Sequence, residues 1–293
     1  MSFEITHILF PTDFSPNAER ALSFAAEIAV QTDASLSLLH AVEHTIPIAR
    51  QSNRNTEQRI KNANKKFDEI IDRLQEEERF QNLSITTILE AGQPVASLLN
   101  QAKEHDAGLI VMGTRGATDD RNVLFGSVTT SLIKKAETPI LTVPHGSTFN
   151  EFKRIIFATD YKEGDWQALN NTIQFAKLFD STIDILHIEQ HENLNAEIRF
   201  RGFRDLVTSK TNYSKVNFHL IHENDFFPGA ADYLIDHPAS LMVMIRYKKT
   251  FWEKFLERDH TREMAFYSKI PLLILSGTLK YDNHIDFEEV SKA

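Results

Sequence analysis

The sequence has no cysteine among its 293 residues, and this absence removes several kinds of chemistry. Disulfide bonds, thiolate metal sites and cysteine nucleophiles are all excluded. No stretch approaches the roughly 20 apolar residues that a membrane-spanning helix needs. The first residues show no basic segment followed by an apolar one, as a secretory signal would. We therefore expect a cytoplasmic protein without a membrane partner.

Positive charge is also scarce, because 32 Lys and Arg residues stand against 41 Asp and Glu residues and the net charge is −9. A nucleic-acid-binding protein usually carries a basic patch that neutralises phosphates. Only isolated pairs such as Lys65-Lys66 and Lys248-Lys249 occur, so no nucleic-acid partner is expected. An acidic protein can still bind a nucleotide, because backbone N–H groups supply local positive potential.

The strongest pattern in the chain is an internal repeat. Four blocks recur in the same order, the first two 147 residues later and the last two 132 residues later. The pairs are Ile8–Asp13 with Ile155–Asp160, Leu38–His40 with Ile185–His187, Leu109–Met112 with Leu241–Met244, and Thr138–Leu141 with Ile270–Leu273. With the polar stretch Gly146-Ser147-Thr148 as the division, we predict a domain at 1–146, a second at 151–277 and a C-terminal tail at 278–293.

Each copy alternates short apolar runs with segments of helical periodicity. In the first copy the expected strands are Ile8–Phe10, Ser35–Val42, Ser84–Leu89, Leu109–Met112 and Ile140–Val143. The expected helices are Ala18–Val30, Ile60–Leu74, Pro94–Lys103 and Val128–Ala136. This alternation predicts an α/β fold of two tandem Rossmann-like domains, each a parallel sheet flanked by helices on both faces. Ligands of such sheets bind beyond the carboxyl ends of the strands.

A glycine motif follows the fourth expected strand. It reads Gly113-Thr114-Arg115-Gly116, then nine residues, then Gly126-Ser127 at the start of a helix. Glycines at a strand end let the backbone turn sharply and approach a ligand closely. Free N–H groups at a helix start form an anion site, and the Ser127 hydroxyl can bond a phosphate or reach a metal. The motif predicts a loop that folds over a polyphosphate.

This motif resembles the nucleotide signature of the universal stress protein family, in which two glycines two residues apart are followed, nine residues later, by Gly and then Ser or Thr. The segment Ile8–Ser15 is similar to the first strand and loop of the ATP-binding members. The resemblance implies five parallel strands per domain in the order 3-2-1-4-5. It also implies a site for ATP, with ADP and AMP as alternatives and Mg²⁺ as an optional companion. The implied binding residues are Pro11, Thr12, Asp13, Ala41, Met112, Gly113, Arg115, Gly116, Gly126, Ser127 and Val128.

The second copy departs from the motif at four positions. Gly113, Gly116, Gly126 and Ser127 are replaced by Ile245, Lys248, Arg258 and Asp259. Asp160 remains in the place of Asp13, but without a phosphate cradle it is not expected to form a site. We therefore interpret the second copy as a degenerate domain with a structural or regulatory role.

Other residue clusters favour simpler interpretations. His187 aligns with His40 at a strand end, and His219 and His222 are three apart in a strand, so they point to opposite faces. Asp119-Asp120 could face Mg²⁺, although a solvated loop tip is favoured. No motif of another nucleotide-binding enzyme and no nucleophile paired with a base is present.

Two classes of function stay open for the chain. The first is a nucleotide-dependent binding protein of the stress response. The second is a slow ATPase or an autophosphorylating protein that uses Ser127, Thr129 or Thr130.

The last strand of each copy predicts how the copies assemble. Ile140–Val143 and Leu272–Leu275 are short and apolar, and each would leave an open sheet edge if it had no partner. The short link near Gly146–Asn150 keeps the two edges at high effective concentration. We expect them to pair within the chain as a pseudo-dimer. A homodimer of whole chains is left open.

Overall fold

The computed structural model describes residues 4–42, 51–116, 124–162, 164–247 and 269–277. The strands are β1 (His7–Pro11), β2 (Ser35–Val42), β3 (Ile85–Ala91), β4 (Leu109–Gly113), β5 (Ile140–Val143), β6 (Arg154–Ala158), β7 (Thr182–Glu189), β8 (Val216–His222), β9 (Leu241–Arg246) and β10 (Leu272–Ser276). The helices are α1 (Pro16–Thr32), α2 (Gln51–Gln75), α3 (Pro94–Glu104), α4 (Ser127–Lys135), α5 (Asp165–Leu178), α6 (Leu194–Lys210) and α7 (Phe226–Asp236), with a 3-10 turn, η1 (Glu78–Phe80). All nine elements expected in the first copy are present, within a few residues at each end except for α2, which begins nine residues earlier.

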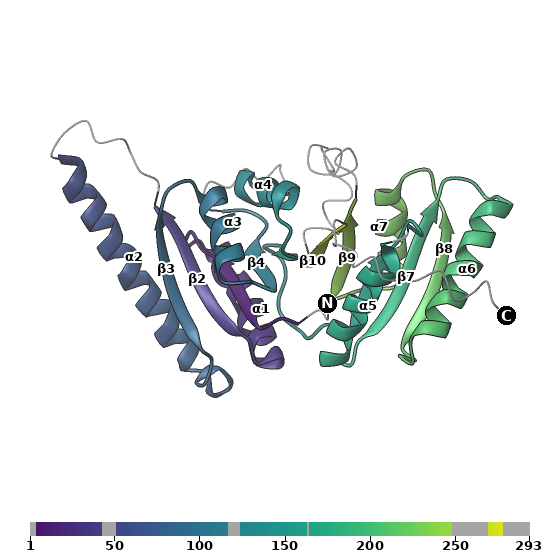
Figure 1. Ribbon diagram of the computed structural model, residues 1–293, viewed down its shortest axis with the longest axis horizontal. Helices are drawn as coiled ribbons and strands as arrows, with labels where there is room; N and C mark the ends of the chain where they lie inside the picture. The colour runs from purple at the N-terminus through teal and green to yellow at the C-terminus, as the bar shows by residue number, and fades with distance from the viewer. Residues whose placement is uncertain (1–3, 43–50, 117–123, 163, 248–268, 278–293) are drawn as a thin grey trace, which may run out of the picture.

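The ten strands form one sheet in the order β3-β2-β1-β4-β5-β10-β9-β6-β7-β8. Figure 1 shows β3, β2 and β4 on one side of β10 and β9, and β7 and β8 on the other. Each half of the sheet is parallel and has the predicted order 3-2-1-4-5. The halves meet where β5 runs antiparallel to β10, with Ile140 opposite Ile274 and Thr142 opposite Leu272. The predicted α/β fold of two Rossmann-like domains is therefore confirmed.

We refer to β1–β5 with their helices as the first domain, and to β6–β10 with theirs as the second. The boundary residues 146 and 151 stay predictions.

Local sequence explains why these elements form. In β1, Ile8, Leu9 and Phe10 are all buried, as expected for a central parallel strand that is covered on both faces. Ser15 caps α1 by accepting a hydrogen bond from the amide of Ala18 at 3.2 Å. Helix α1 then ends at Asp33, whose φ of 55° lies in the left-handed region that stops a helix.

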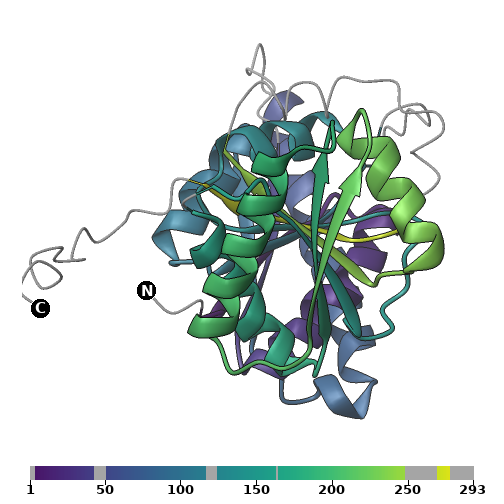
Figure 2. The same cartoon turned by 90° about the vertical axis from the view of Figure 1, so that its right-hand side faces the viewer.

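Helices cover both faces of the twisted sheet (Figure 2). On one face, α1, α2, α5 and α6 contribute to a single apolar layer, in which Phe67 of α2 and Phe203 of α6 are buried. On the other face, α3, α4 and α7 form a second layer that includes Leu98 and Leu234. Each fully buried side chain of this size contributes about 1.5–3 kcal/mol.

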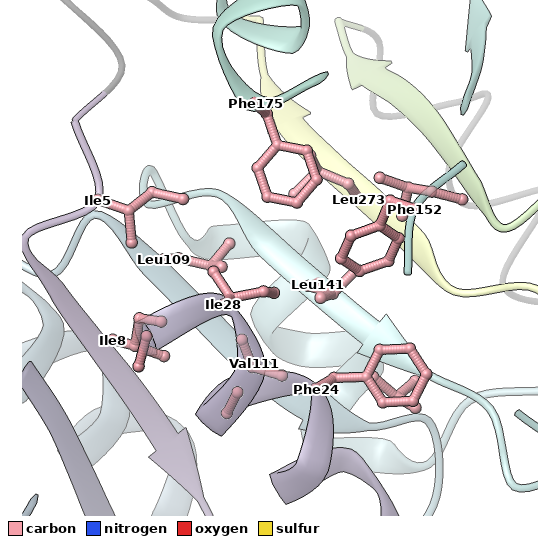
Figure 3. Packing of buried hydrophobic residues seen from close by; sticks show 14 of the residues in the cluster. Ile5, Ile8, Phe24, Ile28, Leu109, Val111, Leu141, Phe152, Phe175 and Leu273 are labelled. Atoms are coloured by element: carbon pink, nitrogen blue, oxygen red, sulfur yellow. The ribbon is translucent and has the colours of Figure 1, made fainter. Parts of the chain in front are cut away.

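An aromatic cluster joins the two domains beside the β5–β10 pair. It consists of Phe24 of α1, Phe149 and Phe152 of the connection, and Phe175 and Phe179 in and after α5. Neighbouring ring centroids lie 5.0–6.4 Å apart. Figure 3 shows three of these rings next to Leu141 and Leu273. The connection expected to be a short polar link thus contains a phenylalanine, Phe149, that packs into this cluster.

Candidate functional site

A cavity of about 510 Å³ lies beyond the carboxyl ends of β1, β2 and β4 and next to the start of α4. This volume is within the usual range for small-molecule pockets. The structure brings all eleven predicted site residues to the cavity wall. They are Pro11, Thr12, Asp13, Ala41, Met112, Gly113, Arg115, Gly116, Gly126, Ser127 and Val128. Seven further residues line the wall. Thr129 was named only as a possible phosphate acceptor, and sequence reasoning missed Ala18, Leu39, His40, Arg59, Pro94 and Leu98.

The loop after β1 is held in place by its own hydrogen bonds. The Thr12 hydroxyl accepts from the amide of Phe14, and the Asp13 carboxylate accepts from the amide of Ser15, both at 3.0 Å. His40 Nδ1 lies 2.8 Å from the carbonyl oxygen of Thr12. The ring of Phe14 packs on His40, with centroids 4.5 Å apart. These contacts fix the Asp13 carboxylate at the cavity wall.

One end of the cavity is apolar. Leu39, Leu98 and Met112 are at most 5% exposed and contribute to its wall together with Pro11 and Ala41. Such a surface suits a flat apolar group, because its burial removes apolar area from water.

None of the three motif glycines has a positive φ, so the sharp turn that the sequence suggested does not explain them, and close contacts explain two of them, Gly113 and Gly116. A Cβ on Gly113 would lie 2.9 Å from Asn17 Nδ2, and one on Gly116 would lie 2.6 Å from Asp13 Oδ2. A Cβ on Gly126 would have no neighbour closer than 3.6 Å. Gly126 is therefore not required by the packing of the described residues, and its missing side chain leaves room at the cavity wall.

The start of α4 is suited to an anion. Gly126 is its N-cap and supplies no side-chain hydrogen bond. The amides of Ser127, Val128 and Thr129 have no acceptor within the helix, because the first turn of any helix lacks one. The helix dipole adds partial positive charge at this end. The Thr129 hydroxyl donates to the carbonyl of Gly113 at 3.1 Å and so ties the helix start to the end of β4.

The second domain has a cavity of about 450 Å³ at the corresponding place, beyond β6, β7 and β9. Two ion pairs contribute to its wall, Lys162 with Asp160 and Arg199 with Glu189. Charged side chains from the loop after β6, from β7 and from α6 therefore contribute to this wall, whereas the wall of the first cavity includes three glycines.

A buried carboxylate closes the loop after β6. Asp165 has no exposed surface and stands where the first domain has Ala18. Its oxygens accept hydrogen bonds from the Thr159 hydroxyl at 2.5 Å and from the amides of Asp160 and Lys162 at 3.0 Å. The hydroxyl of Tyr247 also donates to it, at 2.6 Å. Tyr247 occupies the repeat position of Arg115, which belongs to the glycine motif of the first domain. In the second domain this position therefore contributes a tyrosine to the cavity wall.

His187 agrees with the structural role that its alignment with His40 suggested. Its Nδ1 lies 2.7 Å from the carbonyl oxygen of Thr159, as His40 does from that of Thr12. Tyr161 packs on its ring, and burial raises the pKa of that tyrosine. The described residues contain no group of three or more metal-binding side chains.

Several predicted positions lie outside the described residues. Of the four replacements in the second copy, Ile245 is described, whereas Lys248, Arg258 and Asp259 are not. The pair Asp119-Asp120 also lies outside. No helix in the described segments is long and apolar enough to cross a membrane.

Comparisons with known proteins agree with this architecture. The model of the Universal stress protein family matches residues 4–144. A universal stress protein of Methanocaldococcus jannaschii is 27% identical over 161 residues, which are 49% of this chain and 97% of that protein. The Bacillus subtilis universal stress protein YxiE is 27% identical over 143 residues, which are 46% of this chain and 97% of that protein.

A solved structure extends the similarity to both domains. The crystal structure of a universal stress protein from Archaeoglobus fulgidus has a TM-score of 0.68 to this chain, which it covers to 94%, with 97% of its own chain covered. At 17% identity this match shows the fold alone. Residues 4–144 thus match the Universal stress protein family, and they are followed by a second copy of the same fold.

Proposed function

We propose that the first domain binds ATP and that the chain acts as a nucleotide-dependent binding protein in a stress response. The observation that carries the proposal is the cavity that joins an apolar end, the Asp13 carboxylate and the uncapped start of α4. These three features match the base, the ribose and the phosphates of an adenine nucleotide in the same order. ADP and AMP have the same base and ribose and carry fewer phosphates, so the ligand class is an adenine nucleotide.

Each wall residue has a role in this proposal. Pro11, Ala41 and Met112 contact the base, while Thr12 and Asp13 lie beside the ribose. The phosphates lie against Gly113, Gly116, Gly126 and the amides of Ser127 and Val128, with Arg115 adding positive charge. A Mg²⁺ ion would be held mainly by the phosphates, with the Ser127 hydroxyl within its reach.

Slow ATP hydrolysis or autophosphorylation is the alternative function. Thr129 is a poor phosphate acceptor, because it is 3% exposed and its hydroxyl donates to the Gly113 carbonyl. Ser127 is exposed and lines the cavity, so it is the hydroxyl to test. His40 also lines the cavity, and its Nδ1 lies 2.8 Å from the carbonyl oxygen of Thr12, so this contact fixes the orientation of its ring.

The second domain serves the first as an internal dimer partner in this proposal. The antiparallel β5–β10 pair and the aromatic cluster support that role. Its own cavity has no glycine cradle in the described residues, and its charged side chains are already paired. We therefore propose one nucleotide per chain. A cytoplasmic location and a homodimer of whole chains stay predictions.

The test is to identify the small molecule that co-purifies with the full-length protein by mass spectrometry. We expect an adenine nucleotide, and a protein that carries none and binds none on addition would overturn the proposal. Incubation with γ-labelled ATP then separates the two functions. Retention of intact ATP supports the binding protein, whereas label that transfers to protein and disappears in the Ser127→Ala variant supports autophosphorylation.

A further inference from the structure

Helix α4 presents its first turn to the cavity of the first domain, and its direction depends on contacts with the rest of the protein. It has only nine residues, about 14 Å of helix. Of its side chains, Thr129, Leu132 and Ile133 are buried. Isolated helices of this length are unstable in water, so tertiary contacts must fix the direction of its axis.

One such contact comes from the second domain. Arg246, at the end of β9, donates from Nη1 to the carbonyl of Lys134 at 2.8 Å and from Nη2 to the carbonyl of Ala136 at 2.5 Å. Nη2 also lies 3.3 Å from Ser276 Oγ of β10. The last carbonyls of a helix have no donor within the helix, and they carry the negative end of its dipole. The half-buried guanidinium donates to these carbonyls and also places a positive charge at the negative end of the dipole.

The way the two sheets join explains why Arg246 reaches α4. Because β5 and β10 are antiparallel, the carboxyl end of β10 lies beside Ile140, at the start of β5. Strand β9 runs parallel to β10 with Arg246 next to Ser276. Helix α4 ends just before β5, so the end of β9 comes near the end of α4, where the Arg246 hydrogen bonds are formed.

The repeat gives this contact a particular meaning. Arg246 occupies the repeat position of Thr114, inside the glycine motif of the first copy. In the first domain, the carbonyl of Thr114 accepts a hydrogen bond from Gly126 at 2.7 Å and so holds the start of α4. In the second domain, the same position supplies a long cationic side chain that holds the other end of the same helix.

We propose that Arg246 is a positioning residue for the phosphate end of the first cavity, through which the second domain sets the affinity of the first for phosphate-bearing ligands. This inference rests on the proposed nucleotide binding. The Thr129 bond to Gly113 fixes the start of α4 and Arg246 fixes its end. Together they aim the amides of the first turn at one place. Loss of Arg246 removes the donors that hold the last carbonyls of α4, while Lys134 and Lys135 still supply positive charge in its last turn.

The test compares ATP with adenosine, which lacks the phosphates, by calorimetric titration of the full-length protein. Arg246→Met keeps an unbranched aliphatic side chain but removes the hydrogen-bond donors. Arg246→Lys keeps the charge but cannot bridge two carbonyls as a guanidinium does. The control is Arg199→Met, because Arg199 pairs with Glu189 within the second domain. A purely structural role would lower both affinities together, whereas a positioning role changes their ratio.

We expect Arg246→Met to lower the affinity for ATP about three- to tenfold, as the usual size of helix-end interactions implies, and to leave the affinity for adenosine unchanged. Arg246→Lys is expected to recover part of the loss, and Arg199→Met to change neither affinity. An unchanged ratio in Arg246→Met would overturn the inference, and Arg246→Lys decides by the same ratio if the Met variant does not fold. A wild-type protein that binds adenosine but gains nothing from the phosphates of ATP would instead overturn the proposed function.

Discussion

The two domains have cavities of similar size at the same place in the same fold, yet the cavities differ in what lines them. The first, of about 510 Å³, is lined at one end by glycine backbone and an uncapped helix start. The second, of about 450 Å³, is lined by ion pairs and by Tyr247. Fold and cavity volume therefore do not decide the ligand, and function follows from the residues grafted on the strand ends.

The loop after the first strand of each domain shows how this difference arises. In the first domain, Ser15 caps α1 and the position of Asp165 is held by Ala18, a small residue on the cavity wall. In the second, the Asp165 carboxylate gathers four hydrogen bonds, one of them from Tyr247. In the second domain a side chain, Asp165, thus accepts hydrogen bonds from the backbone amides of the loop after β6. The first domain has the small Ala18 at this position.

The largest expected effect comes from separating the domains. Residues 1–146 alone leave β5 without β10 and expose Phe24, which now packs on the connection. We expect this fragment to dimerise through β5 or to aggregate, because an apolar sheet edge seeks a partner. Analytical ultracentrifugation checks the prediction. A fragment that sediments as a stable, folded monomer would show that the first domain does not need the second.

The next effect tests the glycine end of the first cavity. Gly126→Asp is expected to lower the affinity for ATP by at least about 100-fold, because a carboxylate beside phosphates costs several kcal/mol of binding free energy. The fold is expected to survive, since a Cβ there meets nothing closer than 3.6 Å. The matched control is Gly202→Asp in α6, where a Cβ would have no neighbour within 4 Å. Calorimetry gives the affinities and thermal unfolding verifies the fold, and a Gly126→Asp protein with wild-type affinity would contradict the site.

A third effect concerns the core of the second domain. Asp184 is fully buried and accepts hydrogen bonds from Arg154 at 2.7 Å and Asn217 at 2.8 Å, where the first domain has Ser37 bonded to Thr86. Burial acts to raise the pKa of Asp184, but these hydrogen bonds and the Arg154 charge outweigh it and hold the pKa below 3.8. His219 Nε2 is also 3.8 Å away.

Asp184→Asn is therefore expected to lower the free energy of unfolding by about 2 kcal/mol, less than a fully buried pair would lose, because Arg154 is partly exposed. A depressed carboxyl pKa stabilises the fold above the pKa of the unfolded state, and this contribution is lost as the pH falls. The difference between the two proteins should thus shrink below about pH 4. Urea unfolding at several pH values measures it, with the exposed Asp180→Asn as control. A difference that grows towards low pH would contradict the assignment.

The smallest effect compares the same carboxylate in both domains. Asp13→Asn is expected to lower the affinity for ATP about tenfold, which is the usual loss when a charged acceptor of a ligand hydroxyl is removed. Asp160→Asn is expected to leave ATP affinity unchanged, because Asp160 pairs with Lys162 in the second cavity. Equal losses in both variants would show that the two cavities act alike.

The residues that could be predicted from sequence are those whose signal is local or repeated. The strands, helices and two-copy organisation follow from apolar runs and the 147- and 132-residue offsets. The strand order and the eleven cavity residues came from the resemblance to the universal stress protein family, which the spaced glycine motif carries. Arg246 and Asp165 had no such signal, because the meaning of each depends on a neighbour far along the chain, Lys134 for one and Tyr247 for the other. The reason for Gly113 and Gly116 likewise needed the positions of Asn17 and Asp13.

The central claim is that only the first of two similar cavities binds a nucleotide, and its most direct test is the stoichiometry of the full-length chain. Calorimetric titration with ATP should give one site per chain, and that site should disappear in Gly126→Asp. Two sites of comparable affinity, or a single site that persists in Gly126→Asp, would contradict the account.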